Sequence, residues 1–329
     1  MNYKEYSLYL FNCFNTKVFP EEIYIPNDSW KDFIDLTYDT FKQSYKVKYC
    51  EDLNPVTFKP NNNMIIGYSG GRDSLCSLLK NQETYNVKGI FHCKGLNISY
   101  RNETNVVLET AKTLNIPCEV YSFKNKGTGF EVENPIKNEV IVGLMTDIMS
   151  ENEISNCSMG MFESDHINTI NGFDYYSDYI EPMKLFEKAI QNTFESFKFV
   201  YAFNNQAQEV KYFLDNHSDK LDLLQSCVLP DRYRDYVSKR NSEKYNINIF
   251  KNRCGCSCRK CITELIEIAE YNNEKLNSEL YKHCIDFLRK DLKKKNPETD
   301  FKNTSDEEIL QCYFDFKKFR ELLGCRESA

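Results

Sequence analysis

The sequence lacks any apolar stretch long enough to cross a membrane, because a spanning helix needs about 20 consecutive apolar residues. A secretory signal is missing as well. The apolar run from Leu8 to Phe11 ends at Asn12, with no basic flank and no small-residue cleavage site beside it. We therefore expect a cytoplasmic protein that does not contact a membrane.

An excess of positive charge is also missing. The chain has 42 Lys and Arg against 49 Asp and Glu, which gives a formal net charge of −7. Affinity for DNA or RNA depends mainly on Lys and Arg contacts to phosphates, so a wide nucleic-acid-binding face is not expected. The basic run 289–295 is the exception. We favour a solvated helix end there, with a local basic patch as the alternative.

What the chain does have is the composition of a soluble globular protein, with 41% hydrophobic and 28% charged residues over a length of 329. That length allows more than one folded unit. We predict four regions along it: an N-terminal α+β extension (1–60), a nucleotide-binding domain (61–215), a cysteine-rich zinc-binding segment (216–270) and a C-terminal helical appendage (271–329).

The two outer regions carry patterns of structure but no recognisable chemistry. In the first, Glu5 to Phe14 and Lys17 to Ile25 are expected to be strands, followed by a helix that begins near Trp30, with Asp28 or Ser29 as its cap. In the last, apolar residues recur every four positions from 276 to 288, which predicts helices. We interpret both regions as packing or partner-binding additions.

The central region alternates between strands and helices. Strands expected near 64–67, 87–93, 118–123 and 157–162 are separated by helices expected near 75–82, 103–115 and 139–149. This order predicts an α/β fold with a doubly wound parallel sheet covered on both faces. Ligands of such sheets bind beyond the carboxyl ends of the strands. His92, Glu163 and Asp165 are expected at such ends and are candidate ligand contacts.

The segment that follows the first of these strands is a candidate phosphate site. Two glycines allow a sharp turn and a close approach of bare backbone, and the start of a helix then presents N–H groups and a positive dipole end to an anion. The segment has neither the Gly-Lys-Ser/Thr end of a Walker A loop nor the Gly-x-Gly-x-x-Gly spacing of a dinucleotide site. The candidate phosphate-binding residues are Tyr68, Ser69, Gly70, Gly71, Arg72, Asp73 and Ser74, together with His92.

The 14 cysteines include a cluster with metal-binding spacing. Cys258 and Cys261 are separated by two residues, and a helix expected near Ile262 follows them, as at a zinc knuckle. Because tetrahedral zinc takes four thiolates, the predicted ligands are Cys227, Cys254, Cys258 and Cys261. Cys256 is the rival of Cys254, which we favour because Gly255 can then turn the chain. An iron–sulfur cluster or a redox pair are the alternatives to structural zinc.

Another stretch, 172–179, alternates aromatic residues with carboxylates. It fits two interpretations equally well. One is a lid that stacks on a flat ring and hydrogen-bonds its edges, and the other is a surface loop anchored by tyrosines.

The loop Ser69-Gly70-Gly71-Arg72-Asp73-Ser74, followed by the cysteine knuckle, resembles the 7-cyano-7-deazaguanine synthases, a branch of the PP-loop ATP pyrophosphatases. The resemblance covers about 64 to 265 and implies an adenine nucleotide alpha hydrolase (HUP-like) fold. It also implies an activity: ATP, with Mg²⁺, adenylates the carboxylate of 7-carboxy-7-deazaguanine and releases pyrophosphate. Ammonia then gives the amide, which a second ATP converts to the nitrile.

The resemblance also implies roles for individual residues. Ser69, Asp73 and Lys137 would be catalytic, and Asn138, Glu163, Asp165 and Asp178 would contact the deazaguanine. Lys137 and Asn138 stand where the family has an Arg-Asn pair, so the planar fork of the arginine is lost. Asp178 matches an aspartate of the family's Tyr-x-Asp-Cys-Arg-Pro segment, but the cysteine and arginine are absent here.

Both extensions are foreign to the synthases, which are much shorter. Longer relatives resemble enzymes of anti-phage defence operons that hand the adenylated deazaguanine to a protein amine instead of ammonia, and the extensions would then dock a protein substrate. An RNA sulfur transferase with a PP-loop is a third hypothesis, disfavoured by the acidic chain. A module that binds ATP without turnover is the fourth. The chain could also form a homodimer.

Overall fold

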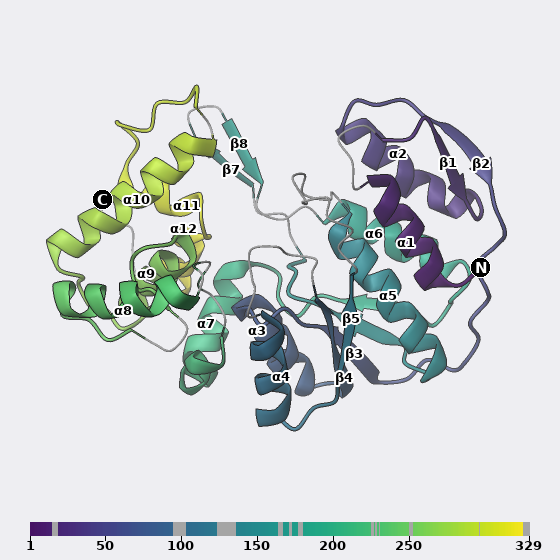
Figure 1. The fold of residues 1–329 in the computed structure, drawn as a ribbon, viewed down its shortest axis with the longest axis horizontal. Coiled ribbons are helices and arrows are strands. Elements are labelled where there is room, and N and C mark those ends of the chain that lie inside the picture. The colour runs from purple at the N-terminus through teal and green to yellow at the C-terminus, as the bar shows by residue number, and fades with distance from the viewer. Residues whose placement is uncertain are drawn as a thin grey trace.

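The computed structural model describes residues 1–14, 19–94, 103–123, 136–163, 167–170, 173–176, 180–224, 227, 229, 231–249, 253–295 and 297–324. At its centre is a five-stranded sheet with the order β5-β4-β3-β6-β9, in which every neighbouring pair is parallel (Figure 1). The chain enters at the middle strand, builds one half of the sheet and then returns to build the other. The strand order therefore reverses at β3. The strands are β3 (Asn63–Gly67), β4 (Asn86–Lys94), β5 (Cys118–Ser122), β6 (Asn156–Ser158) and β9 (Lys198–Val200).

Helices cover both faces of this sheet, as the apolar runs of its strands require. Along β3, Met64 and Ile66 belong to one buried cluster and Ile65 to the other, because successive side chains point to opposite faces. The first cluster includes residues of α3 (Arg72–Gln82), α4 (Glu103–Thr113) and α7 (Gln206–His217). The second includes residues of α5 (Lys137–Glu151) and α6 (Glu181–Gln191). The predicted α/β fold with a covered parallel sheet is confirmed.

The N-terminal region differs from the prediction. Glu5 to Phe14, expected to be a strand, lies within the helix α1 (Tyr3–Phe14). The buried residues Tyr6, Leu10 and Phe14 recur every four positions and pack beside α5, where a Cβ on Gly143 would stand 1.8 Å from the Ser7 hydroxyl oxygen. Aromatic residues with a preference for strands favoured the wrong assignment, and packing decided the outcome.

The rest of this region follows the prediction in part. The second expected strand, Lys17 to Ile25, is present in its last part as β1 (Glu22–Ile25). This strand pairs in parallel with β2 (Lys46–Tyr49). The helix expected near Trp30 is present as the 3₁₀ turn η1 (Asp28–Trp30) followed by α2 (Lys31–Thr40), but the side chain of Asn27 caps it, not Asp28 or Ser29.

Two expectations for the core need correction in detail. The strand predicted for 157–162 is shorter: β6 spans only Asn156–Ser158, and Phe162 makes an isolated bridge with Phe203. Within 172–179, the part 173–176 forms β8 (Phe173–Tyr176), which pairs with β7 (Ile167–Ile170) in an antiparallel hairpin. The remainder of that stretch lies outside the described residues.

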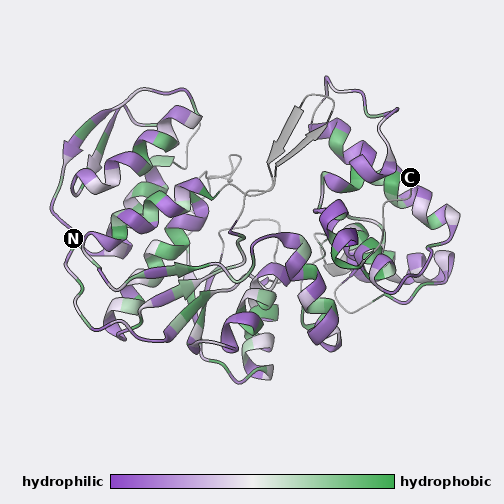
Figure 2. Ribbon diagram, turned by 180° about the vertical axis from the view of Figure 1, so that it is seen from behind, coloured by the Kyte–Doolittle hydropathy of each residue, from purple (hydrophilic) through white to green (hydrophobic). Residues whose placement is uncertain are grey.

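The C-terminal region 271–329 is helical, as predicted, with α10 (Ser278–Lys295), α11 (Asp306–Gln311) and α12 (Phe316–Leu322). Before it lie the 3₁₀ turn η2 (Ser218–Leu223), the helix α8 (Asp231–Tyr245), which was not predicted, and α9 (Arg259–Tyr271), which begins close to the helix start expected near Ile262. Their apolar side chains join the cluster formed by β3, α3 and α7, so this region extends the core of the sheet. Apolar residues are frequent along the sheet strands and on one side of the helices (Figure 2).

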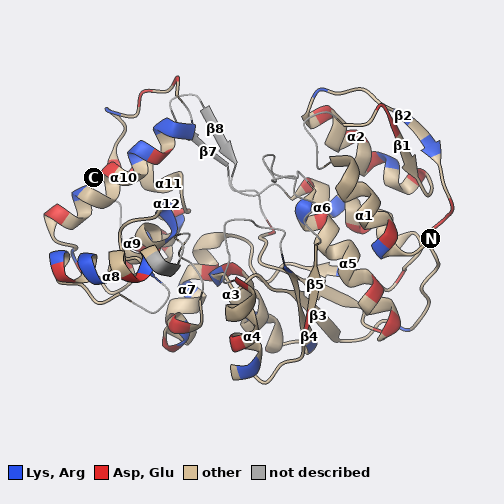
Figure 3. Cartoon of the chain, in the orientation of Figure 1, with Lys and Arg blue, Asp and Glu red and all other residues tan. Residues whose placement is uncertain are grey.

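The charged residues of these helices alternate in sign, as on α8 and α10 in Figure 3. In the basic run, Arg289 pairs with Asp286 and Asp306, and Lys295 pairs with Asp291. The run is thus the partly neutralised end of a solvated helix. Among the described residues, no helix combines the length and the apolar character that a membrane span requires.

Candidate functional site

A pocket of about 160 Å³ opens at the carboxyl ends of β3 and β4, between the N-termini of α3 and α5. This is the edge at which the strand order reverses, where open α/β sheets bind their ligands. The pocket gathers Tyr68, Ser69, Asp73, Ser74, His92, Lys137 and Asn138, all of which the sequence analysis proposed for ligand contact. The remaining lining residues are Gly67, Phe91, Cys93, Glu103, Ile141, Met159 and Gly160.

The loop between β3 and α3 folds tightly on itself. Gly70 has a φ of +79°, a left-handed conformation that a side chain would strain. The Ser74 hydroxyl donates a hydrogen bond to the Gly71 carbonyl oxygen at 3.0 Å and accepts one from the Ser69 N–H at 3.2 Å. Ser74 therefore holds the turn in shape, whereas the exposed Ser69 side chain is available at its rim.

The main-chain N–H groups from Gly70 to Ser74 have no hydrogen-bond partner in the part of the chain that the structure describes, and we call them open in this sense. Gly71 is the N-cap of α3 and has no side chain to offer, and the first amide of this segment with a backbone acceptor is that of Leu75. Within the described residues, only the Ser69 N–H of the loop is occupied by another protein group. Unpaired N–H groups at a helix N-terminus, together with the positive end of its dipole, attract an anion.

Gly160 brings a second backbone segment against the loop. A Cβ at Gly160 would lie 2.7 Å from both the Asp73 carbonyl carbon and the Ser74 nitrogen. Because real Cβ atoms do not approach a backbone that closely, only glycine lets the chain after β6 pack on the start of α3. The position of the open N–H groups depends on this contact.

The Arg72 side chain points away from the pocket. Its Nε donates to Glu209 at 2.8 Å, and its Nη1 binds Glu267. Both glutamates are buried, and burial followed by the charge of Asp73 raises the pKa of Glu209 well above its usual range. The guanidinium thus ties α7 and α9 to the loop. The phosphate contact that was expected for the Arg72 side chain is therefore not available, and Arg72 is not part of the pocket lining.

His92 is buried at the end of β4 and is 1% exposed. Its Nδ1 lies 3.1 Å from the Tyr68 carbonyl oxygen, which can only accept, so Nδ1 carries the proton. Its Nε2 then accepts from the Thr104 hydroxyl at 3.0 Å. Burial lowers the pKa of His92, which keeps the imidazole neutral. His92 joins the start of the loop to the first turn of α4, while its ring forms part of the pocket wall.

Lys137 and Asn138 are in the first turn of α5, opposite the phosphate loop. The next residue, Glu139, is 3% exposed, and burial raises its pKa to about 7. Glu163, expected to contact substrate, is exposed and is not part of the pocket lining. Asp165 and Asp178 lie outside the described residues, so their expected roles stay predictions.

Glu103, which the sequence pattern did not single out, also lines the pocket. Glu103 begins α4 and is only 8% exposed, and burial raises its pKa to about 7 against the attraction of Lys260 and Lys137. Its position near the carboxyl end of β4, on the same edge as His92, was the available signal. Cys93 also lines the pocket, and burial raises the pKa of its thiol.

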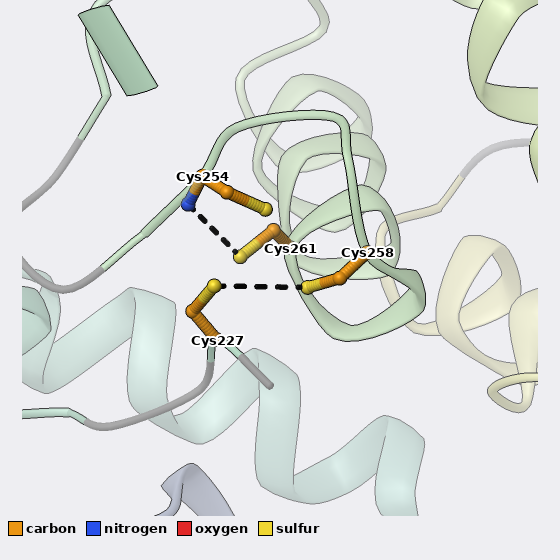
Figure 4. Close-up of side chains that lie close together, drawn as sticks. All are labelled: Cys227, Cys254, Cys258 and Cys261. Carbon is orange, nitrogen blue, oxygen red and sulfur yellow. Dashed lines mark hydrogen bonds between the residues drawn. The ribbon is translucent and has the colours of Figure 1, made fainter. Parts of the chain in front are cut away.

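The favoured four cysteines come together beside α9 (Figure 4). The sulfur atoms of Cys227, Cys254, Cys258 and Cys261 lie within 4.8 Å of one another, and all four residues are at most 3% exposed. Cys256 belongs instead to the core cluster around β3 and α7. Gly255 has a φ of +75°, so the chain turns between Cys254 and Cys256 as expected.

Backbone N–H groups support these sulfurs in the manner of a thiolate site. The Leu229 N–H donates to Cys227 at 3.5 Å, and the Cys254 N–H donates to Cys261 at 3.4 Å. Hydrogen bonds from Cys227, Cys254 and Cys261 lower the pKa of Cys258. A buried set of four sulfur donors suits zinc or an iron–sulfur cluster. The group could therefore hold a metal ion.

Helix α9 joins the two sites. It carries Cys261 at its start and Glu267 two turns later, where Glu267 binds Arg72 of the loop. Between them, Glu264 accepts from Arg253 at 2.7 Å, and Arg253 also donates to the Leu224 carbonyl at 2.8 Å. The cysteine segment is thus braced against the pocket through one helix.

Comparison with known proteins adds no assignment: no protein-family model matches the chain, and a search of curated proteins finds no significant relative. Function has to be argued from the chemistry of the site. The open N–H groups at the start of α3 and the charged side chains around the pocket are the features that bear on it.

Proposed function

We propose that the protein is an ATP-dependent, adenylate-forming enzyme that activates the carboxylate of 7-carboxy-7-deazaguanine for attack by a nitrogen nucleophile, on a PP-loop fold of the adenine nucleotide alpha hydrolase type. AMP and pyrophosphate are the other products. The observation that carries the proposal is the row of open main-chain N–H groups from Gly70 to Ser74, at the edge where the sheet order reverses.

In this proposal the loop binds the departing pyrophosphate. Its N–H groups and the Ser69 hydroxyl donate to phosphate oxygens, and they are fixed before the reaction begins, so little reorganisation is needed as charge develops. Lys137 approaches from the opposite wall and balances the negative charge of the α-phosphate. Asp73 would hold Mg²⁺, which neutralises phosphate charge when bound.

The pocket is large enough for the phosphates and the carboxylate but too small for the whole of ATP and the acid. Its volume of about 160 Å³ is below the roughly 300–1,000 Å³ of pockets that enclose a drug-sized ligand. We assign to it the phosphates and the carboxylate, with Asn138 as a hydrogen-bonding partner of the acid. Holding the acid and the α-phosphate in one small space supplies much of the rate, because it replaces a chance encounter.

We further propose that the four-cysteine group holds a structural Zn²⁺. Four thiolates close its coordination and leave no position for substrate, and N–H donors already orient the sulfurs. When bound, the ion cross-links the segment around Cys227 to the start of α9. That connection fixes Glu267 and, through it, Arg72.

The activity test is the release of AMP and pyrophosphate from ATP and Mg²⁺ with ammonium, with and without 7-carboxy-7-deazaguanine. We expect release only when the acid is present. Ser69→Ala and Asp73→Asn should each reduce the rate by about 100-fold or more, the usual loss for one preorganised group at a developing charge. Lys137→Met should also reduce it, whereas Lys184→Met, on the exposed side of α6, should not.

Two outcomes would reject the proposal. One is the absence of acid-dependent AMP from the wild-type chain. The other is an undiminished rate in Ser69→Ala and Asp73→Asn together with a normal response of the wild type.

A protein amine is the second candidate for the nucleophile, as in defence enzymes that modify a partner. Tyr24, Phe41 and Tyr49 are 41%, 44% and 63% exposed, and all three belong to the N-terminal extension that the synthases lack. Exposed aromatic residues are frequent at protein interfaces. Intact-mass analysis of proteins encoded beside this one, co-expressed with it, should reveal an added deazaguanine. Unshifted masses alongside normal amide formation would favour ammonia.

A further inference from the structure

Glu103 is a buried carboxyl in the described pocket lining. It opens α4, 8% exposed, and shares the pocket with Ser69, Asp73 and Lys137. Three other buried glutamates, Glu209, Glu264 and Glu267, are each bound by an arginine. Within the part of the chain that the structure describes, Glu103 has no hydrogen bond or salt bridge.

A buried carboxyl without a partner is costly to the fold, since its lost hydration is not replaced. Packing alone would select an apolar residue at the start of α4, where Val106 and Val107 are already buried. The cost is explained if a ligand supplies the missing partner. Because Glu103 shares the pocket with Ser69 and Asp73 of the phosphate loop, we take this ligand to be one that reacts there.

We infer that Glu103 accepts the proton of the attacking nitrogen when the adenylate is converted to the amide. This inference rests on the proposed function. As the nitrogen lone pair forms the new bond to the carboxyl carbon, the bond from that carbon to the AMP oxygen breaks and AMP leaves with its electron pair. One proton moves from the nitrogen to Glu103, which later returns it to water, so the step needs no further reactant.

The arrangement of charge around Glu103 suits a base. Lys137 of α5 and Lys260 of α9 attract its carboxylate, and burial opposes ionisation more strongly, so its pKa is raised to about 7. The other titratable groups of the pocket are Tyr68, Asp73 of α3, and His92 and Cys93 of β4. In the proposed function Asp73 holds Mg²⁺, and His92 uses both ring nitrogens within the fold. A base near pKa 7 is suited to proton transfer at neutral pH.

The test separates adenylation from aminolysis. Adenylation is measured by the exchange of labelled pyrophosphate into ATP in the presence of 7-carboxy-7-deazaguanine. Amide formation from ammonium measures adenylation and aminolysis together. Glu103→Gln should retain exchange within about threefold and lose about 100-fold or more in amide formation, as general-base catalysis implies. Glu103→Asp should recover part of this loss. Glu109→Gln, an exposed glutamate of the same helix, is the matched control and should behave as wild type.

The pH profile provides a readout that a purely structural role would not move. With unprotonated ammonia held at constant concentration, the wild-type amide rate should rise with pH through about 7 and then level off, because only the carboxylate form accepts a proton. Glu103→Gln should lack this rise.

Equal losses of exchange and amide formation in Glu103→Gln, or an unchanged amide rate, would overturn the assignment while leaving adenylation intact in the wild type. Absence of exchange in the wild-type chain would instead reject the proposed function, and the assignment with it.

Discussion

The pocket and the four-cysteine group are two polar centres of opposite kind. In the cysteine group the sulfurs face one another, and backbone N–H groups point at them. Around the pocket, the N–H groups of Gly70 to Ser74 and the carboxyl of Glu103 have no hydrogen-bond partner in the described part of the chain. A centre whose groups serve each other stabilises the fold, whereas unpaired groups are tolerated where a ligand completes them. Helix α9 connects the two centres. A change in the four-cysteine group should therefore alter ligand binding in the pocket.

Loss of a cysteine ligand should give the largest effect. Cys254→Ser removes one thiolate from the group of four and should abolish stoichiometric zinc. We expect the unfolding free energy to fall by more than about 4 kcal/mol, in the range reached when a metal site is lost. Elemental analysis and denaturant unfolding measure both quantities.

Cys256→Ser is the matched control for that variant. Cys256 is equally buried but packs with the sheet core, so zinc should remain at one per chain. Retention of zinc by Cys254→Ser, with loss in Cys256→Ser, would contradict the ligand assignment.

Breaking the connection between the two centres should have the next largest effect. Glu267→Ala leaves Arg72 with Glu209 alone and should destabilise the fold by about 3–5 kcal/mol, the usual cost of removing one partner from a buried ion pair. ATP affinity should fall as well, because the loop loses its brace. Glu270→Ala, which breaks a partly exposed pair with Arg320, should cost less than about 1 kcal/mol. Similar costs for the two variants would show that α9 does not support the loop.

The pH dependence of stability should show the smallest effect. Glu139 is fully buried, with its pKa raised from 4.5 to about 7, so the native state binds a proton that the unfolded state releases between these values. The stabilisation is complete below pH 4.5 and is lost as the pH rises through 7, for a total of about 3 kcal/mol.

Urea unfolding at pH 5 and pH 8 tests this prediction. The wild-type chain should lose stability at pH 8, and Glu139→Gln should lose less of it, whereas Glu109→Gln should follow the wild type. A larger pH dependence in Glu139→Gln would contradict the assignment. Glu103 contributes in the same direction.

The sequence predicted what depends on neighbours along the chain. The order strand, two glycines, helix is a local pattern, and it led to the loop at the carboxyl end of β3. The spacing of Cys258 and Cys261 and the turn at Gly255 are local as well. The sheet followed from regular alternation of apolar segments.

What the sequence did not predict depends on distant partners. The partners of Arg72 are 137 and 195 positions away in the chain, so nothing nearby announced that its side chain leaves the pocket. The helix α1 was missed because its fit against Gly143 of α5 outweighs the strand preference of its aromatic residues. Glu103 follows β4 in the chain, but its burial arises only when α4 closes the pocket wall, so the sequence pattern did not single it out.

The central claim is that the open N–H groups at the start of α3 bind the phosphates of ATP, and calorimetric titration with ATP and Mg²⁺ tests it most directly. We expect saturable binding to the wild-type chain. Gly160→Ala, which forces a Cβ against the backbone of Asp73 and Ser74, should lose at least about tenfold in affinity, or about 1.4 kcal/mol. Absence of binding to the wild-type chain, or equal affinity in Gly160→Ala, would contradict the account.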